Sequence, residues 1–532
     1  MAGLEEAFER IGAAAEHHLP RTNAPGLSLA VTDADDTLGA VVRGFADVAA
    51  GRPVLPDTRF QIGSIGKSFA ALCVLQEAAK GTLSLDVSIN EVLPWLELPE
   101  PFGPIALHHL LTHSSGLMAG NIEAGWGMID AVRARSHPPS WAPGQRFWYS
   151  NLGYTLVGLA LERASRTPVH RLLMERILGP LGMTRSVGAI LEDDRPDAAV
   201  GYEPIDADRV PHLQTPLGPA VWQPSTTADG SIVSTAPDLC AYARMVLARG
   251  GDLLEEASFA RWIGPYVDSG ERGERYGYGW DVLDRDGRRV LRHTGGTVGF
   301  SALLELWPDD GLAVAICQNG SGDHGPLAAF ALGTVAAAVR GDEPPAEPSW
   351  AAPAAAELAG TYVGTERSLR IELAGGEVMI HAGPLAVPLE RIWSDPDELV
   401  VPHPALDRYP LRVVREPGGT VAGLAHGPAW FPAEGRAEPD PADHPPAWEA
   451  FTGLYRTDSP WTRAYRVYLR RGRLYLLLPV GGDEQELLPL DDGAFAVRDP
   501  ELPMRVRFTE PVEGQAQTLE FNGMRLTRSF EA

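Results

Sequence analysis

Two segments rich in proline, alanine and acidic residues divide the chain into one long and two short parts. They run from Gly341 to Pro353 and from Glu434 to Pro446. Such compositions favour exposed connections, and a chain of 532 residues is long enough for about three domains. We therefore expect domains at residues 1–343, 354–434 and 447–532.

The two short parts carry the same pattern. Gly360-Thr-Tyr362 in the first is matched by Gly453-Leu-Tyr455 in the second. In both parts, alternating apolar residues are interrupted by turn glycines, as they are in β-hairpins. We expect two small antiparallel β barrels, lipocalin-like in form, or else two curled sheets.

The long part mixes strand and helix patterns. Strand patterns at 25–31 and 38–44 favour a hairpin, and three more follow between 289 and 317, before a final helix at 326–340. Helical patterns dominate from about residue 64 to 247. Strands at both ends of a helical middle predict an α+β domain whose antiparallel sheet joins distant segments.

The charge balance limits the classes of partner. With 70 acidic and 45 basic residues, the net charge is −25, which repels phosphate backbones and anionic lipids. We expect no nucleic-acid partner and no membrane partner, since no apolar run approaches the ~20 residues that span a bilayer. The acidic N-terminal stretch lacks the basic flank and apolar core of a signal peptide, which predicts a cytoplasmic protein.

The sequence indicates neither a disulfide framework nor a metal site. Each of the 3 cysteines lies within an apolar stretch, as buried thiols do. His108, His109 and His113 have no acidic or cysteine partners at ligand spacing, so helix packing is the favoured interpretation. We expect no metal and no cofactor.

Lysine is so rare in this chain that its positions are informative. Lys67 and Lys80 are the only lysines among 45 basic residues. Lys67 follows Ser64 by one helical turn, at the start of an apolar helix pattern that ends at Gly81. A desolvated lysine can lose its proton and then accept that of a serine, which arginine cannot do. The alternative is a helix N-cap beside a solvated lysine.

A second segment, Trp141 to Asn151, ends in an aromatic run before a helical pattern. Tyr149 and Asn151 flank Ser150 there and could offer a phenol and a carboxamide from a fixed loop. The phenol could move a proton if cationic neighbours lower its pKa, and the amide could orient a carbonyl group or the lysine. Alternatively, Tyr149 is a core residue whose hydroxyl has its own partner.

A third segment lies between two strand patterns and reads His293-Thr294-Gly295-Gly296. Paired glycines at a strand edge permit close backbone approach to a ligand, so the N–H of Gly296 could hold an oxyanion. His293 could project towards the same place as a hydrogen-bond donor or a pH-sensitive cation. The alternative is a glycine-rich turn with an exposed histidine.

Together these segments resemble the serine β-lactamase and penicillin-binding-protein superfamily, in particular its class C-like branch. That branch combines Ser-x-x-Lys, Tyr-x-Asn and a later Lys/His-Thr/Ser-Gly strand motif in this order. The resemblance covers about residues 5 to 340. It implies a catalytic domain made of an antiparallel sheet and a helical region, which works through an acyl-enzyme without a metal.

The resemblance also implies a role for each motif residue. Ser64 would attack an amide or ester carbonyl, and Lys67 with Tyr149 would receive and relay its proton. Tyr149 would then protonate the leaving group and activate the deacylating water, while Asn151 anchors the amide of the substrate.

The strand motif implies substrate binding by Thr294, Gly295 and Gly296, with the N–H groups of Ser64 and Gly296 holding the oxyanion. Where β-lactamases and D,D-carboxypeptidases usually carry a lysine, this chain has His293, which would join the catalytic group. Histidine at this position is more similar to D-aminopeptidases, esterases and peptide-cyclising thioesterases. The two C-terminal β domains are similar to the arrangement in D-aminopeptidases.

These features predict a serine hydrolase that acts on a small molecule or short peptide, most like a D-stereospecific aminopeptidase or an esterase. A thioesterase or acyltransferase that releases or cyclises a peptide is the second hypothesis, and a catalytically idle ligand sensor is the third. An oligomer is compatible with the sequence.

Overall fold

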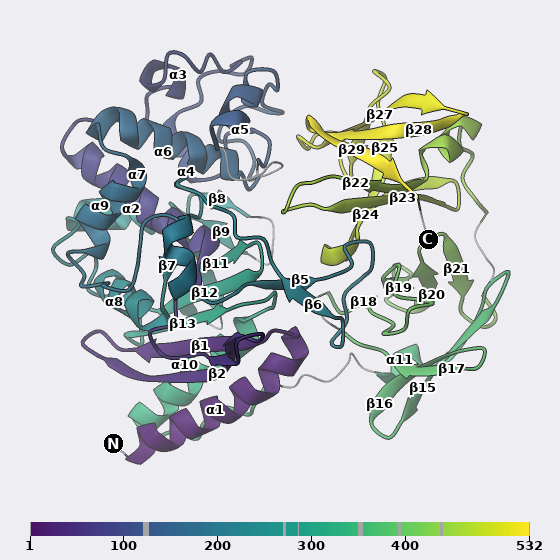
Figure 1. The fold of residues 1–532 in the computed structure, drawn as a ribbon, viewed down its shortest axis with the longest axis horizontal. Coiled ribbons are helices and arrows are strands. Elements are labelled where there is room, and N and C mark those ends of the chain that lie inside the picture. Colours follow the sequence, from purple (N-terminus) through teal and green to yellow (C-terminus); the bar gives the residue numbers. More distant parts are fainter. Residues whose placement is uncertain are drawn as a thin grey trace. The chain divides into compact units, whose positions relative to one another are not determined.

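The computed structural model describes residues 2–120, 127–269, 273–285, 287–348, 355–391, 395–436 and 440–530 (Figure 1). The chain forms two compact units. Unit 1 comprises Met1–Glu203 and Pro219–Pro348, and unit 2 comprises Pro204–Gly218 and Ser349–Ala532. Parts of both expected linkers lie outside the described residues, so the domain limits expected at 343, 354, 434 and 447 stay predictions.

Unit 1 contains an antiparallel sheet that joins the two ends of the unit. Its order in the described part of the chain is β3-β2-β1-β13-β12-β11-β10-β9-β8. The strands are β1 Gly26–Thr32, β2 Thr37–Asp47, β3 Arg52–Pro53, β8 Val267–Asp268, β9 Arg275–Tyr276, β10 Asp281–Arg285, β11 Arg288–Thr297, β12 Phe300–Trp307 and β13 Leu312–Gln318. The expected N-terminal hairpin and the expected pairing of distant strands are both present, which confirms the α+β class.

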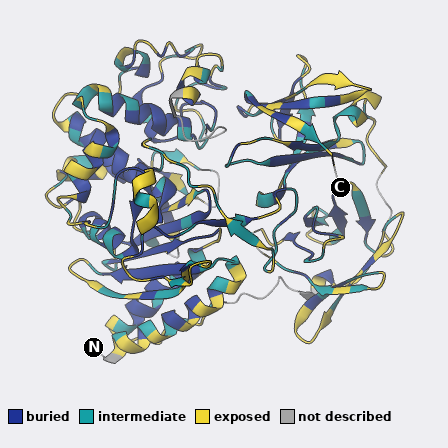
Figure 2. Cartoon of the chain, viewed as in Figure 1, coloured by how far each residue is buried: buried dark blue, intermediate teal, exposed yellow. Residues whose placement is uncertain are grey.

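Helices cover both faces of this sheet. Alternate residues of β13 point to opposite faces, so Val314 belongs to the core under α1 (Ala2–Thr22) and α10 (Gly325–Arg340). Ala315 belongs instead to the core under α8 (Ala236–Leu247) and α2 (Gly66–Ala79). The remaining helices of unit 1 are α3 Ile89–Val92, α4 Leu107–Leu111, α5 Gly127–Ala134, α6 Asn151–Ser165, α7 Val169–Leu173 and α9 Glu256–Trp262. In Figure 2 the central strands of this sheet are mostly dark blue, because both of their faces are buried.

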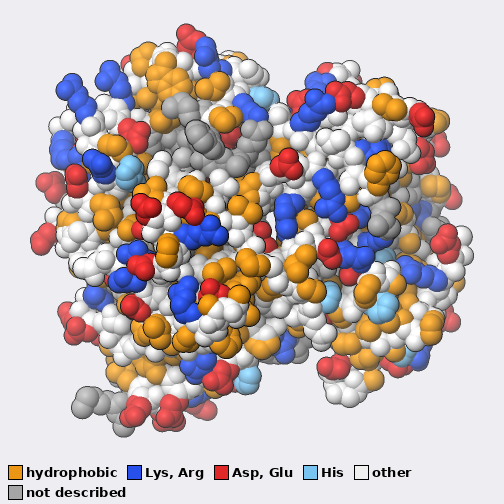
Figure 3. All heavy atoms as spheres, viewed as in Figure 1, with side chains coloured by type: hydrophobic (Ala, Val, Ile, Leu, Met, Phe, Trp, Pro, Cys, Tyr) orange, Lys and Arg blue, Asp and Glu red, His pale blue; other side chains and the backbone are white. Residues whose placement is uncertain are grey.

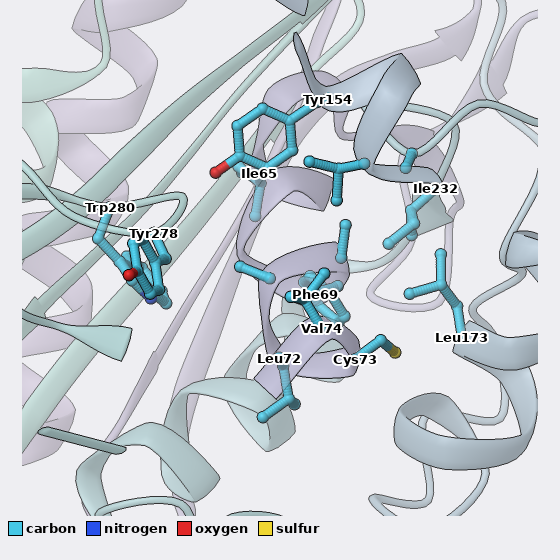
Figure 4. Close-up of a cluster of buried hydrophobic side chains, with 14 of the residues drawn as sticks. Ile65, Phe69, Leu72, Cys73, Val74, Tyr154, Leu173, Ile232, Tyr278 and Trp280 are labelled. Atoms are coloured by element: carbon cyan, nitrogen blue, oxygen red, sulfur yellow. The ribbon is translucent and has the colours of Figure 1, made fainter. Parts of the chain in front are cut away.

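Helix α2 lies inside the larger core, as its almost continuous apolar sequence predicts. Figure 4 shows its side chains meeting residues from several other elements. Phe69 stacks on Tyr242 from α8, with the ring centroids 3.6 Å apart. The helix ends at Ala79, and Gly81 adopts the left-handed φ of 73° that favours glycine as a helix stop. Because α2 is packed on all sides, its first turn offers a rigid support for functional groups.

Unit 2 contains two antiparallel β domains. Strands β22 to β29 form a closed barrel, whereas β14 to β21 form two four-stranded sheets. The single bridges Tyr362↔Ala433 and Glu390↔Val400 join the two sheets at both seams. The strands are β14 Gly360–Val363, β15 Ser368–Ala374, β16 Glu377–Ala382, β17 Leu385–Pro388, β18 Glu398–Leu399, β19 Leu411–Arg415, β20 Val421–His426, β21 Ala429–Pro432, β22 Gly453–Arg456, β23 Ala464–Arg470, β24 Arg473–Leu478, β25 Asp483–Pro489, β26 Phe495–Val497, β27 Arg505–Val512, β28 Gln515–Phe521 and β29 Met524–Ser529. The predicted fold class is confirmed. Of the two β domains, only the last has strands hydrogen-bonded all the way round into a closed barrel.

A hairpin from the first part of the chain packs in unit 2. Residues 204–218 run from the end of strand β5 (Tyr202–Pro204) into strand β6 (Leu217–Pro219). Within that segment, Val210 N donates to Asp407 O at 2.7 Å, and Leu213 N donates to a Glu390 carboxylate oxygen at 2.7 Å. These bonds explain why 204–218 groups with the β domains and not with the segments that flank it.

Charged side chains of both signs are interspersed over the visible face (Figure 3). Many carboxylates pair with arginine, as Asp310 does with Arg340 at 2.8 Å. Exposed pairs of this kind contribute only about 0–1 kcal/mol each, so they disperse charge more than they stabilise the fold. Among the described helices, none has both the length and the apolar character needed to cross a bilayer.

Two buried histidines meet beneath the sheet of unit 1. His18 Nε2 lies 3.3 Å from His324 Nδ1, and His324 Nε2 lies 2.9 Å from Ser301 Oγ. Burial lowers the pKa of His18 to about 4 and that of His324 to about 3. Both rings are therefore neutral in the folded protein, whereas the unfolded chain protonates histidine below about pH 6.5.

Acidification is expected to destabilise unit 1. Between about pH 6.5 and pH 4 the unfolded chain binds more protons at these histidines, so the free energy of unfolding falls as the pH falls, by about 2 to 3 kcal/mol for His324 at pH 4.5. The variant His324→Gln removes this group and should flatten the dependence. Urea unfolding of both proteins across this range measures the slopes, and equal slopes would contradict the prediction.

Candidate active site

Ser64 lies in a short 3-10 turn, Gly63–Ile65 (η1), that leads directly into α2. The residue is partly exposed, so its hydroxyl can meet a ligand. Lys67, in the first turn of α2, is 0% exposed, and its Nζ donates to Ser64 Oγ at 2.9 Å. The lysine is therefore not the solvated one of the alternative interpretation.

Three oxygens surround the amine of Lys67. Besides Ser64 Oγ, its Nζ contacts Asn151 Oδ1 at 2.6 Å and the backbone oxygen of Asp229 at 2.7 Å. Burial lowers the pKa of Lys67 to about 7, and the negative charge of Asp229 opposes part of that shift. At neutral pH a substantial fraction of this amine is uncharged and can accept a proton.

Tyr149 lies just before α6, half-buried beside the same amine. Its hydroxyl shares a hydrogen bond with the Ser64 hydroxyl, and Lys67 Nζ lies 4.9 Å from the centre of its ring. Burial raises the pKa of Tyr149 above its usual value, and the bond to Ser64 offsets only part of this shift. The lowered pKa considered from the sequence is therefore not found, and at neutral pH Tyr149 is a neutral phenol that can donate a proton.

The loop that carries Tyr149 and Asn151 is fixed from below by His113. His113 Nδ1 accepts a hydrogen bond from Ser150 N at 3.0 Å, and its ring lies 4.2 Å from the Tyr149 ring between centroids. Ser150 in turn caps α6, since its Oγ accepts from Gly153 N at 3.1 Å. Sequence reasoning assigned His113 to helix packing and missed this positioning contact.

The end of β11 packs against the turn that holds Ser64. A Cβ atom on Gly295 would lie 1.9 Å from Ile62 O, so only glycine fits there. A Cβ atom on Gly63 would lie 2.6 Å from Gly296 N, which places the backbone of Gly296 beside that of the turn. A Cβ atom on Gly296 would meet nothing within 4 Å, so this position is open.

His293 does not have the expected role of a hydrogen-bond donor or a cation that faces the ligand. The side chain is 3% exposed, its Nδ1 lies 2.6 Å from Thr294 O, and its Nε2 lies 2.8 Å from Tyr276 Oη. A carbonyl oxygen can only accept, so Nδ1 carries the proton and Nε2 accepts from Tyr276. Burial lowers the pKa of His293 to about 3, which keeps the ring neutral. Its ring centroid lies 6.3 Å from that of Tyr149, while Thr294 is exposed.

Residues 5–337 match the Beta-lactamase family over more than half of the chain. The chain belongs to the beta-lactamase family.

Relatives of this beta-lactamase-family protein include one named as an esterase and one named as a D-aminopeptidase. It is 31% identical over 332 residues to Esterase EstB of Burkholderia gladioli, covering 54% of this chain and 84% of that protein. It is 27% identical over 390 residues to a D-aminopeptidase of Gluconobacter oxydans, covering 70% of each. A solved structure of an octameric penicillin-binding protein homologue from Pyrococcus abyssi matches with a TM-score of 0.59 and 23% identity, over 88% of this chain and 98% of that chain. That likeness concerns the fold alone.

The structure brings the predicted residues of this beta-lactamase-family protein together. Ser64, Lys67 and Asn151 are linked by hydrogen bonds, Tyr149 bonds to Ser64, and the 293–296 strand end adjoins the same turn. Sequence reasoning assigned His113 to helix packing and gave no roles to Asp229 and Tyr276, the other two partners that hold these residues. Each contacts a residue from a separate segment, and a single sequence carries no signal for such a pairing. Within the described residues, no group of three or more His, Cys, Asp or Glu side chains could hold a metal ion.

Replacing Gly295 with alanine is expected to disrupt the site and lower stability. The added Cβ would overlap Ile62 O, so the strand end or the Ser64 turn must move, at an expected cost of about 1–3 kcal/mol or more. The matched control is Gly296→Ala, whose Cβ meets open space and should change the unfolding free energy little. Thermal unfolding of both variants measures the difference, and equal midpoints would contradict the packing described above.

Proposed function

We propose that this chain is a serine hydrolase that cleaves small amides or esters through an acyl-enzyme on Ser64, most like a D-stereospecific aminopeptidase or an esterase. The observation that carries the proposal is the buried amine of Lys67, 2.9 Å from Ser64 Oγ and with a pKa of about 7. The names of the two relatives, an esterase and a D-aminopeptidase, support the substrate classes.

Acylation begins with proton transfer from Ser64 to Lys67. In its neutral form the amine donates its two N–H groups to Asn151 Oδ1 and Asp229 O, which turns its lone pair towards Ser64 Oγ. Oγ attacks the carbonyl carbon as its proton moves to Nζ. The N–H groups of Ser64 and Gly296 would hold the resulting oxyanion.

Collapse of the tetrahedral intermediate requires a proton on the leaving group. Tyr149 is suited to donate it, because its raised pKa keeps the phenol protonated and its hydroxyl bonds to the Ser64 oxygen. The ammonium of Lys67 then restores the phenol proton. In deacylation, a water molecule attacks the ester and loses one proton to the neutral amine of Lys67. The bond between the acyl carbon and Ser64 Oγ then breaks, the Lys67 ammonium returns that proton to Oγ, and the free acid leaves.

The neutral state of His293 supports substrates without a carboxylate next to the scissile bond. A buried, uncharged ring whose two nitrogens are both engaged cannot meet an anion as a lysine would. Binding of anionic β-lactams or D-alanyl-D-alanine ends is therefore disfavoured. Neutral or cationic acyl groups suit this site better.

Mass spectrometry of the intact protein tests the proposal. The protein is exposed briefly to a panel of D- and L-aminoacyl esters and short acyl esters, and then digested. We expect an acyl adduct on the peptide that contains Ser64, followed by its loss and release of the free acid. The proposal fails if no member of the panel gives either an adduct or a product.

Two further readouts separate the competing functions. An added amine nucleophile that captures most of the acyl group would identify an acyltransferase, since a hydrolase delivers it mainly to water. Labelling of Ser64 by a fluorophosphonate without turnover of any ester would identify a ligand sensor.

A further inference from the structure

One oxygen of the Asp229 carboxylate lacks a hydrogen-bond partner near the reactive serine. This oxygen, Oδ1, is buried and has no hydrogen-bond partner in the described part of the chain. The backbone of the same residue is held in place, since Asp229 O accepts from Lys67 Nζ at 2.7 Å. A Cβ atom on Gly230 would lie 3.0 Å from the carbonyl carbon of Gly63, so this segment runs against the Ser64 turn.

A buried carboxylate oxygen without a partner costs free energy that a ligand can recover. Removing an ionised oxygen from water without a compensating hydrogen bond is unfavourable, and a cationic donor placed there reverses the loss. The neighbouring Lys67 does not fill this role, because its three polar contacts go to Ser64, Asn151 and the Asp229 backbone. Asp229 as a whole is only partly buried, so a group from outside the protein can approach its carboxylate.

Another carboxylate near the site already has an arginine partner. Asp281 contributes negative charge at Tyr149, but it lies 3.9 Å from the guanidinium of Arg292, which also contacts Glu274 at 3.3 Å. His293 adds no positive charge, since both its nitrogens are engaged within the protein. Apart from the amine of Lys67, which has a pKa of about 7, the charge that a substrate would meet beside Ser64 is therefore the negative charge of Asp229.

We propose that Asp229 is a specificity-determining residue that accepts a hydrogen bond from a protonated amine of the substrate, close to the carbonyl that Ser64 attacks. The inference rests on the proposed function and narrows its substrates to aminoacyl amides and esters with a free α-amino group. An α-ammonium lies two bonds from the carbonyl carbon, so a substrate bound at Ser64 presents it near the Asp229 segment.

Two substrates with the same acyl skeleton test whether Asp229 binds the ammonium of the substrate. D-alanine p-nitroanilide carries the ammonium, and propionyl p-nitroanilide lacks it. We expect the wild-type protein to favour the first by about 10- to 100-fold in kcat/KM, the range that a charged hydrogen bond supplies. Asp229→Asn keeps the shape and the backbone carbonyl, and should remove this preference mainly through KM. Because the change also removes a charge that acts on Lys67, both substrates are measured at the same pH, and their ratio within each protein is the quantity compared.

Asp281→Asn is the matched control, because it removes a carboxylate that already has an arginine partner. It should leave the ratio between the two substrates unchanged. An equal loss on both substrates in Asp229→Asn, with a shifted pH profile, would show that Asp229 only tunes Lys67 and would overturn the inference. Equal hydrolysis of both substrates by the wild-type protein would overturn it too, while leaving the proposed function intact.

A binding measurement keeps the inference testable without turnover. D-alaninamide is titrated calorimetrically into the Ser64→Ala protein and into the same protein carrying Asp229→Asn. Binding that is about 10-fold weaker or more in the double variant supports the ammonium contact, even if hydrolysis itself is never observed. Equal affinities would overturn it.

Discussion

Replacing Ser64 with alanine is expected to abolish turnover of every amide and ester that the protein accepts. The side chain supplies the atom that forms the covalent intermediate, so the loss in kcat should reach about 10⁴- to 10⁶-fold, as for other nucleophile deletions. The acyl adduct and the fluorophosphonate label should disappear with it. Steady-state rates and intact mass of the variant measure both effects.

Ser68 provides a matched control for this prediction. It lies one turn further along α2, where its hydroxyl donates to Ile65 O at 2.9 Å and accepts from Tyr242 at 2.9 Å. Ser68→Ala should lower stability by about 1–3 kcal/mol, because the Tyr242 hydroxyl loses its buried partner, while Ser64 still becomes acylated. Full activity of Ser64→Ala would refute the nucleophile assignment.

Replacing Lys67 with arginine is expected to lower kcat by about 10³-fold or more, within the range for loss of a general base at a nucleophile. Arginine keeps the positive charge but cannot release its proton in a protein, so Ser64 would lack an acceptor. Lys80→Arg is the control, since this exposed lysine pairs with Glu77 at 3.2 Å. Single-turnover acylation rates compare the three proteins, and equal rates for Lys67→Arg and the wild type would refute the base assignment.

The same base predicts the pH dependence of the wild-type protein. The neutral amine is the active form, and its pKa is about 7. The value of kcat/KM should therefore rise as the pH increases through about 7 and level off above it. This rising limb should be absent in Lys67→Arg. A flat wild-type profile across that range would mean that another group accepts the Ser64 proton.

Much of unit 1 could be predicted from local patterns. The apolar helix that follows Ser64, the N-terminal hairpin and the late strands can all be predicted from hydrophobic periodicity and glycine placement. Convergence of Ser64, Lys67, Tyr149 and Asn151 followed from the order of three motifs that resemble one superfamily. These properties depend on residue type and spacing, which the sequence contains directly.

The protonation states could not be predicted in the same way. The phenol of Tyr149 has a raised pKa because neighbouring segments bury it, and His293 is neutral because Tyr276 and Thr294 engage its nitrogens. Both effects depend on which distant residues arrive in the fold. The placement of residues 204–218 with the β domains has the same origin, since its hydrogen bonds run to residues such as Asp407.

Because Lys67 activates Ser64, the reactivity of Ser64 depends on whether the segments that hold Lys67 are folded. The amine is held by a side chain at position 151 and a backbone oxygen at position 229, so it cannot activate the hydroxyl until these remote stretches have docked. The rate of covalent labelling thus reports the fraction of molecules in which these three segments of unit 1 are folded together.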